Sequence, residues 1–370
     1  MLGSGLAVWL ALIFSMKTTA DILILGGGVI GLAIALELKL QGASVAVLCR
    51  QFEEAASQAA AGMLAPQAEG IPPGAMRELC IRSRDLYPEW IQKLESISGQ
   101  TTDYWACGIM APAYCQADFP HAVTQWQTAT AIHQQQPNLS DEVIGGWWFP
   151  EDAQVDSRKL ARSLWLAVQE LGVTIDSGVT VQEIVRQADR VTHLRTSDGD
   201  YQAAHYILAT GSWSQDLLPI PVVPRKGQMM AVRVPDPTQL PLQTVLFGSE
   251  SYIVPRQDGR IVIGATSENV GFLPGNTPAG MQQLMRRATR LVPAIANYTI
   301  EEFWYGFRPA TPDEWPLLGT SAYENLTLAT GHYRNGILLT PITGQIIANW
   351  VLRQEADAVL NAFHWSRFTA

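Results

Sequence analysis

Metal ligands are scarce in this chain. Its four cysteines are Cys49, Cys80, Cys107 and Cys115, and they lack the spacing of a metal site. Its six histidines contain no H-x-x-x-H pair, so metal catalysis is not expected. The cysteines are more simply explained as reduced, partly buried thiols, which is typical of a cytoplasmic protein.

Positive charge gathers nowhere along the sequence. The chain has 25 Lys and Arg against 34 Asp and Glu, a formal net charge of −9 at pH 7. With no basic run, no nucleic-acid partner is expected. Hydrophobic residues make up 47% and charged residues 16%, and no internal repeat or low-complexity linker interrupts them. This composition predicts an ordered protein with a large core.

The apolar run at the start of the chain, Gly5–Phe14, is too short to cross a bilayer as a helix. No Lys or Arg precedes it, and the following Thr-Thr-Ala is a weak cleavage site for a secretory signal. Met16 stands just before the first expected strand. We therefore expect the protein to begin at Met16 and residues 1–15 to be an apolar extension, with a signal or membrane-associating segment as the alternative.

A glycine-rich turn is the clearest motif. The short apolar segment Ile22–Leu25 suits a buried parallel strand, and residues 29–41 suit a helix. Between them, Gly26, Gly28 and Gly31 fit G-x-G-x-x-G, with one glycine each for the turn, the approach of a pyrophosphate and strand–helix packing. The helix N-terminus offers N–H groups to a phosphate. The motif predicts a dinucleotide cofactor.

The next expected strand, 43–48, completes the βαβ unit but ends without the usual acid. Cys49 stands where Asp or Glu would bind a ribose hydroxyl, and Arg50 follows it. An arginine without the acid can indicate NADP, because guanidinium suits its extra phosphate. The turn therefore leaves the kind of dinucleotide open.

Further segments have readable secondary-structure signals. Residues 75–98 have apolar side chains at helical spacing, and Asp156 is placed to cap a helix over 157–171. From residue 222 the sequence changes to short alternating runs separated by turn residues, which is typical of an antiparallel sheet. Other strands are expected at about 173–176, 190–196 and 203–209.

We therefore expect an α/β fold with two domains. A discontinuous Rossmann-like cofactor domain would comprise residues 16–85, 150–215 and 305–370. A second, substrate-binding domain built on an antiparallel sheet would comprise 86–149 and 216–304. A crevice between the domains would hold a small substrate.

Five stretches then occur in an order that resembles a known family: SQAAAGMLAPQAE from residue 57, ESYIVPR from 250, GATSE from 264, GFRPATPD from 306 and GHYRNGILL from 331. They resemble the D-amino-acid oxidase family of flavoproteins, and in particular its glycine-oxidase branch of thiamine biosynthesis. The resemblance implies oxidation of a small amino acid to an imine, with FAD as cofactor and O2 as electron acceptor. Covalent attachment of the flavin is not expected, because no cysteine follows Cys115.

The resemblance also implies cofactor contacts. Val29 and Ile30 would lie on the pyrophosphate turn, Val181 near the adenine, and Cys49 or Arg50 near the ribose. The flavin would be lined by Ser57, Ala61, Gly62 and Met63. Helix N-terminal N–H groups near the pyrimidine end of the flavin would come from His332, Tyr333, Arg334, Asn335, Gly336, Ile337 and Leu338, where they would stabilise the negative charge of the reduced ring.

The substrate carboxylate has three implied partners. Arg308 matches the family arginine that would bind it through two parallel hydrogen bonds. Arg334 and the hydroxyl of Tyr252 match groups that border the same site. No dedicated catalytic base is implied, so the rate effect would come from positioning.

Two departures from the glycine-oxidase pattern leave the substrate open. Glu250 replaces a histidine and Ser267 a methionine, and both would make the pocket more polar. Glycine ranks first by resemblance, followed by sarcosine and small D-amino acids. A D-amino-acid dehydrogenase that reduces quinone and a flavin-binding protein without turnover remain as alternatives. A thiazole-forming partner and a homo-oligomer are further expectations.

Overall fold

The computed structural model describes residues 17–18, 20–115 and 126–368. The expected start at Met16 and the apolar extension before it lie outside these residues. Within the described ranges, none of the helices combines the length and the apolar character needed to cross a bilayer.

A six-stranded sheet carries the predicted βαβ unit at its centre. Strand β1 (Ile22–Leu25) lies between β2 (Val45–Cys49) and β12 (His205–Leu208), and it is parallel to both. All four β1 residues are buried, as expected for a strand covered on both faces. The remaining strands are β8 (Thr174–Ser177), β18 (Leu317–Thr320) and β19 (Leu326–Thr330). The predicted Rossmann-like sheet is confirmed.

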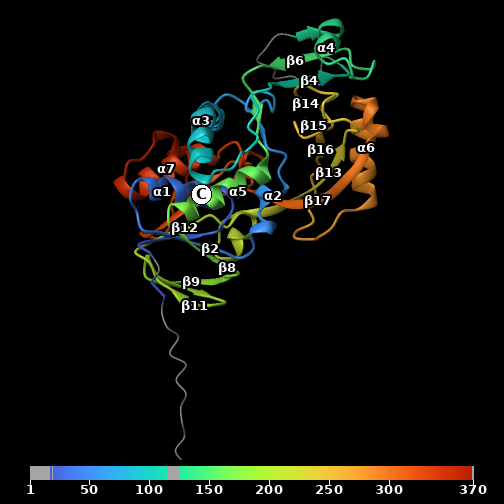
Figure 1. Ribbon diagram of the computed structural model, residues 1–370. Coiled ribbons are helices and arrows are strands. Elements are labelled where there is room, and N and C mark those ends of the chain that lie inside the picture. The colour runs from blue at the N-terminus through green and yellow to red at the C-terminus, as the bar shows by residue number, and fades with distance from the viewer. Residues whose placement is uncertain (1–16, 19, 116–125, 369–370) are drawn as a thin grey trace, which may run out of the picture.

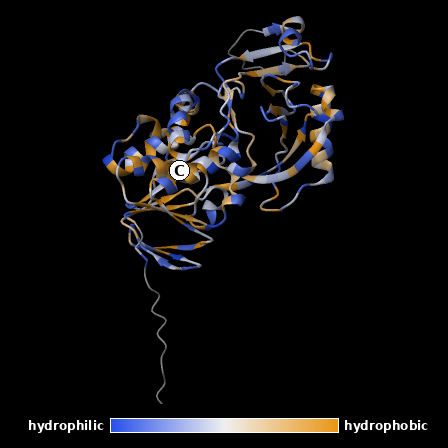
Figure 2. Ribbon diagram, in the orientation of Figure 1, coloured by the Kyte–Doolittle hydropathy of each residue, from blue (hydrophilic) through white to orange (hydrophobic). Residues whose placement is uncertain are grey.

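Alternating side chains of β1 meet different layers. Ile22 and Ile24 face a helical layer, whereas Leu23 and Leu25 face a three-stranded sheet. That smaller sheet comprises β9 (Val181–Gln187), β10 (Arg190–Thr196) and β11 (Gly199–Tyr201). The helical layer comprises α1 (Val29–Leu40), α3 (Ala75–Ser98), α5 (Ser157–Glu170) and α7 (Thr340–Arg353), on the opposite side from β9 and β11 (Figure 1). Figure 2 shows hydrophobic residues gathered in these strands and helices.

A second sheet, of eight strands, lies beside the six-stranded sheet and contains the antiparallel strands predicted from residue 222 onward. Its order is β17-β13-β16-β15-β14-β4-β6-β5, and its pairs are antiparallel except β14 with β4. Helices α4 (Ala129–Gln135) and α6 (Pro278–Leu291) cover one face. The strands are β4 (Ile109–Ala113), β5 (Trp126–Thr128), β6 (Gly145–Phe149), β13 (Val223–Arg233), β14 (Val245–Phe247), β15 (Tyr252–Pro255), β16 (Arg260–Gly264) and β17 (Thr299–Ala310).

Two elements cross the expected domain limits. Helix α3 continues through residues 85 and 86 to Ser98, and strand β17 runs through 304 and 305. Leu94 of α3 still packs in the core beneath the six-stranded sheet, and β17 pairs with β13 along its whole length, so the chain crosses between the two sheets after these elements and not at the expected limits. The division into two domains stays a prediction.

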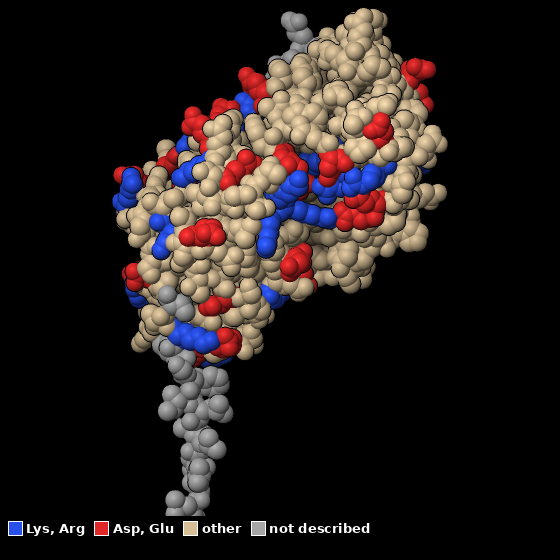
Figure 3. Space-filling view, viewed as in Figure 1, with Lys and Arg blue, Asp and Glu red and all other residues tan. Residues whose placement is uncertain are grey.

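Charged side chains of both signs are interspersed on the face shown in Figure 3. Several are paired across elements, such as Arg158 with Glu302 at 2.7 Å and Arg233 with Glu301 at 2.7 Å. Exposed pairs of this kind add about 0–1 kcal/mol each, so they contribute little to stability.

Candidate active site

A cavity of about 440 Å³ lies where the carboxyl ends of β1 and β2 approach the second sheet. Open α/β sheets bind ligands outside the carboxyl ends of their strands. The cavity is lined from the first layer by the glycine turn and from the second by strands β13, β15, β16 and β17. Its lining includes most of the predicted residues: Gly26, Gly28, Val29, Ile30, Cys49, Arg50, Ser57, Ala61, Gly62, Met63, Val181, Tyr252, Arg308, His332, Tyr333, Arg334, Gly336 and Ile337.

Three predicted cofactor residues are not part of this lining: Gly31, Asn335 and Leu338. A Cβ on Gly31 would lie 2.0 Å from the carbonyl oxygen of Gly26, so Gly31 permits close strand–helix packing. The carbonyl of Leu338 accepts a hydrogen bond from Ser83 Oγ at 2.6 Å, within the helical layer. Their contact with a cofactor stays a prediction.

The glycine turn leaves room for a ligand. Gly26 has φ +118°, and a Cβ there would lie 2.4 Å from the carbonyl oxygen of Ala209. The atom nearest to a Cβ on Gly28 is Ala55 Cβ at 3.8 Å, so the turn is open at this point. Gly28 is the N-cap of α1, which has no side-chain cap and no acidic residue in its first turn. Free N–H groups and the positive end of the helix dipole therefore face the cavity, which fits a pyrophosphate.

The small-residue loop after α2 (Ala56–Ala59) forms a second side of the cavity. Gly62 has φ +79°, and a Cβ there would lie 1.9 Å from the carbonyl oxygen of Val155. Ser57 is buried, and its hydroxyl has no hydrogen-bond partner in the described part of the chain. Glycine and alanine let the backbone lie close to a flat ligand, and the Ser57 hydroxyl has bonding capacity left for one.

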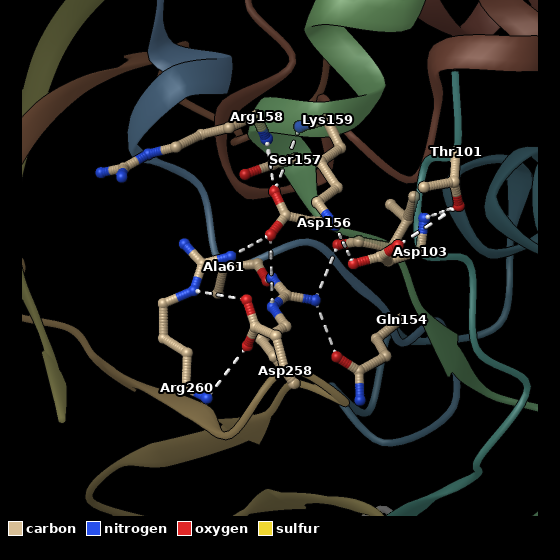
Figure 4. Close-up of polar contacts among 12 residues, drawn as sticks. Ala61, Thr101, Asp103, Gln154, Asp156, Ser157, Arg158, Lys159, Asp258 and Arg260 are labelled. Atoms are coloured by element: carbon tan, nitrogen blue, oxygen red, sulfur yellow. Dashed lines mark hydrogen bonds and ion pairs between the residues drawn. The ribbon is translucent and has the colours of Figure 1, made fainter. Parts of the chain in front are cut away.

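The buried guanidinium of Arg256 donates hydrogen bonds that fix this loop. Its Nη2 donates to the carbonyl oxygen of Ala61 at 2.6 Å, and its Nη1 donates to Gln154 Oε1 at 2.7 Å and to the carbonyl oxygen of Val155 at 3.0 Å. Figure 4 shows Ala61, Gln154 and Asp156 converging on this point from different elements. Arg256 was not singled out from the sequence.

Asp156 supplies the negative charge beside Arg256. Its carboxylate accepts from the backbone N–H groups of Arg158 and Lys159 at 3.0 and 3.1 Å, so it caps α5 as predicted. It also pairs with Arg256 at 3.9 Å and with Arg260 (Figure 4). Burial opposes ionisation, but Arg256 and Arg260 hold the pKa of Asp156 below its ordinary value. The carboxylate therefore stays charged while it is buried.

The expected ribose end of the cavity has no acid. Burial raises the pKa of the Cys49 thiol to about 11, so it stays neutral and is a weak acceptor. The guanidinium of Arg50 lies over the ring of Trp213, 4.4 Å from its centroid, and donates to Glu54 at 2.6 Å. The guanidinium of Arg50 therefore already contacts Trp213 and Glu54. Val181, which was expected near the adenine, lines the same cavity.

Two of the three predicted carboxylate partners, Arg308 and Tyr252, lie on the second sheet, each beside a glycine. A Cβ on Gly227 would lie 2.4 Å from Arg308 Nη1, and one on Gly264 would lie 2.4 Å from the hydroxyl oxygen of Tyr252. Arg308 is half-buried, and its Nη1 donates to the carbonyl oxygen of Thr266 at 3.2 Å. Two glycines thus make the space in which these polar groups reach the cavity.

The Tyr252 hydroxyl donates to Met229 Sδ at 3.2 Å. Burial raises the pKa of Tyr252, while Arg308 nearby opposes that rise. The phenol therefore remains protonated at neutral pH and can donate a hydrogen bond to an anion in the cavity.

The segment before α7 is not a regular α-helix. Tyr333–Asn335 forms a 3₁₀ turn and α7 begins at Thr340, so residues 332–338 precede the α-helix. The Arg334 side chain is exposed, with its guanidinium 5.1 Å from the centroid of the Tyr333 ring. His332 is buried beside Thr343 Oγ1 at 3.2 Å, and burial lowers its pKa to about 3. A neutral His332 is therefore part of the cavity wall.

Two carboxyl groups in the lining, those of Asp216 and Glu69, were not predicted from the sequence. Glu69 ends the stretch SQAAAGMLAPQAE and lines the cavity with Arg308 and Arg334. No local spacing or charge pattern distinguishes it from a surface glutamate. Glu250 and Ser267, the two departures from the glycine-oxidase pattern, also line the cavity, which makes it more polar as expected.

Fold and site together define a dinucleotide-binding oxidoreductase. Residues 21–350 match the model of the family DAO, described as FAD dependent oxidoreductase, and the chain belongs to that family. Its cofactor is accordingly FAD, and the NADP alternative is set aside.

Similar proteins agree with this assignment. The chain is 57% identical over 360 residues to the "Bifunctional protein ThiO/ThiG" of Trichormus variabilis, covering 95% of this chain but only 55% of that protein. It is 34% identical to the "Glycine oxidase" of Geobacillus kaustophilus, covering 94% of this chain and 97% of that one. The crystal structure of glycine oxidase from Geobacillus kaustophilus superposes with a TM-score of 0.88 at 33% identity, covering 94% and 98% of the two chains. The chain thus spans about half the length of the bifunctional relative.

Proposed function

We propose that this protein is an FAD-dependent amino-acid oxidase that acts on glycine and other small amines or D-amino acids. The substrate would lose two electrons and become an imine, which water hydrolyses to glyoxylate and ammonia when the substrate is glycine. Oxygen would take the electrons and leave as hydrogen peroxide. The likeness to glycine oxidases over nearly the whole chain supports this reaction.

The cofactor would be held by the first layer. The glycine turn and the N-terminus of α1 would bind the pyrophosphate, while Ser57 and the loop Ala61–Met63 would contact the flavin. Bound FAD supplies the two-electron acceptor of the reaction. These assignments rest on the open space above Gly28 and on the uncommitted hydroxyl of Ser57.

The substrate carboxylate would bind Arg308. The guanidinium can offer two parallel N–H groups, which fix the orientation of a carboxylate as well as its position. Tyr252 would donate a further hydrogen bond, and Arg334 would border the same pocket. With the acid end fixed, the Cα–H bond of a small substrate is held in one place, which lowers the entropic cost of reaction. The observation that carries the proposal is the Arg308 guanidinium at the cavity wall, in the space left by Gly227.

The proposal is tested with purified, FAD-loaded protein. Anaerobic addition of glycine should bleach the flavin absorbance, and readmission of oxygen should restore it with one hydrogen peroxide formed per glycine consumed. Sarcosine and small D-amino acids compared in the same assay would rank the substrates. Flavin that stays oxidised with all of these compounds would contradict the proposal, and reoxidation by quinone but not by oxygen would favour a dehydrogenase.

A thiazole-forming protein is the proposed partner in thiamine biosynthesis. The bifunctional relatives carry this kind of chain joined to a second part in one polypeptide, as their length and their name indicate. We expect the imine or glyoxylate to be delivered to such a partner, and we expect the chain to form a homo-oligomer. Light scattering of the chain alone, and of its mixture with a separately expressed thiazole synthase, tests both expectations.

A further inference from the structure

The carboxyl group of Glu69 has an unusual environment for a cavity wall. It lines the same cavity as Tyr252, Arg308 and Arg334. Among the described residues, no hydrogen bond or ion pair within 4.0 Å uses this carboxylate, although both arginines act on it electrostatically. Glu69 is part-buried, and a carboxyl group that faces a cavity without a protein partner is placed to meet a donor supplied by a ligand.

The turn that carries Glu69 is firmly held. Asp152, whose side chain is fully buried, accepts from the backbone N–H groups of Gln67 at 3.3 Å and Ala68 at 2.8 Å. Arg84 Nη1 donates to the other oxygen of Asp152 at 3.2 Å, and the N–H of Glu69 donates to the carbonyl oxygen of Ala65 at 3.0 Å. These bonds fix the turn from both sides, so Glu69 is presented to the cavity by a supported backbone.

The charges of this wall match a zwitterion. Arg308 and Arg334 present positive charge for a carboxylate. Of the three acidic residues in the described lining, Asp216 and Glu250 are exposed and Glu250 pairs with Arg290 at 3.6 Å, whereas Glu69 is part-buried and acted on by both arginines. An amino acid whose carboxylate lies on Arg308 has its ammonium group two bonds further on. Glu69 is the partner of opposite charge that this wall offers to the ammonium group.

We propose that Glu69 binds the substrate ammonium group and accepts the proton that it must lose before oxidation. The inference rests on the proposed function. In this step an N–H bond of the ammonium breaks and an O–H bond forms on the Glu69 carboxylate. The nitrogen keeps the electron pair, which becomes the second bond of the C=N group when the hydrogen on Cα leaves with its two bonding electrons; bound FAD would supply the acceptor for them. Glu69 then releases its proton to water and returns to the carboxylate.

The environment suits an exchangeable proton at neutral pH. Burial raises the pKa of Glu69 to about 7, and Asp152 and Glu314 act in the same direction. Arg334 and Arg308 oppose the rise. A base with a pKa near the working pH has the best balance of ionised fraction and proton affinity.

The first test is the pH dependence of flavin reduction by glycine, followed anaerobically in the FAD-loaded enzyme. In the parent, the limiting rate should rise with a pKa near 7. In Glu69→Gln this inflection should disappear, the rate at pH 7 should fall about 100-fold, and the rate should recover toward pH 10, where the free amine is present. Glu69→Asp should retain an inflection at a lower rate. The matched control is Glu78→Gln, an exposed glutamate on α3, which should keep the parent profile.

The second test separates ammonium binding from an effect on the arginines. Acetate has a carboxylate but no ammonium, and its binding can be followed by the perturbation of the flavin absorbance. Glu69→Gln should bind acetate as well as or better than the parent and should bind glycine at least tenfold more weakly. Equal weakening of both ligands, or an unchanged pH profile, would overturn the proposal. If glycine bleaches neither parent nor variant, the proposed function fails, whereas a parent that reacts and a variant with the same profile remove only the role of Glu69.

Discussion

Arg256 Nη2 lies 2.6 Å from the carbonyl oxygen of Ala61 and donates a hydrogen bond to it. The guanidinium belongs to the second sheet, at the end of β15, and Ala61 belongs to the loop that lines the cavity. The loop expected to contact the flavin is therefore fixed by a buried cation from the layer expected to hold the substrate.

Replacing Arg256 should loosen FAD and destabilise the fold. Arg256→Met removes three hydrogen bonds and leaves the buried Asp156 with Arg260 as its remaining cationic neighbour. Breaking a buried pair in this way costs about 3–5 kcal/mol of unfolding free energy. We expect that loss in urea unfolding of the holoenzyme, together with a higher Kd for FAD in a fluorescence titration. The matched variant Arg233→Met, whose partners are at the surface, should change the unfolding free energy by about 1 kcal/mol or less. Equal effects of the two variants on stability and FAD binding would contradict the role of Arg256 in fixing the loop at Ala61.

Arg308→Lys tests the carboxylate contact. A lysine keeps the charge but cannot form two parallel hydrogen bonds in one plane, and a hydrogen bond to a charged group contributes about 1.5–3 kcal/mol. The KM for glycine should therefore rise roughly 10- to 100-fold, while the Kd for FAD stays within a factor of two to three of the parent. Unaltered flavin reduction at low glycine concentration would remove Arg308 from the substrate site.

Gly227→Ala tests the same contact without touching the arginine. The added Cβ would lie 2.4 Å from Arg308 Nη1, so the guanidinium must move away. We expect a higher KM for glycine with little change in FAD binding, measured by steady-state peroxide release and by fluorescence. Gly172→Ala is the control, because its added Cβ meets no atom within 4 Å. Its positive φ should cost some stability, and its KM should equal that of the parent.

His205 should make the fold sensitive to acid. Burial, with a smaller effect from Arg190, lowers the pKa of His205 from 6.5 to about 4. Between these pH values the unfolded chain binds a proton that the folded chain does not, so stability falls as the pH drops from 6.5 toward 4. The stability lost over this window is about 3 kcal/mol, because one pKa unit corresponds to about 1.4 kcal/mol. His205→Gln can keep the hydrogen bond to Thr327 and should flatten the profile of unfolding free energy against pH by that amount. A variant as acid-sensitive as the parent would contradict the assignment.

The elements that could be predicted from the sequence are those with local signals. The βαβ unit, α3 and α5 follow from apolar periodicity, the glycine turn and the Asp156 cap, and their bounds agree with the structure within two residues. The strands of 101–150 were missed, because β4 and β6 gain stability from pairing with distant strands. The parallel pairing of β14 with β4 joins segments more than a hundred residues apart, which no local pattern encodes. Helix α6 was also missed, although Thr277 and Pro278 at its start are readable signals.

The residues of the candidate site also fall into two groups, those with a local signal in the sequence and those without one. The glycine turn was readable from physical principles, and the resemblance identified Tyr252 and Arg308. Glu69 and Arg256 were not found, because what matters about each is its position relative to distant residues. Arg256 contacts Ala61, nearly two hundred positions away in the chain, and Glu69 faces arginines from the last third of the sequence.

Asp156 also limits how freely this enzyme can be re-engineered. One carboxylate starts α5, which packs on α1 beneath the dinucleotide turn, and it also anchors the turn between β15 and β16 through Arg260. Libraries that vary residues 257–259 to broaden substrate range will therefore select first for variants that still retain the flavin. Changes of substrate preference are better sought at Glu250 and Ser267, which also line the cavity; the ion pair of Glu250 with Arg290, at 3.6 Å, is exposed and contributes little to stability.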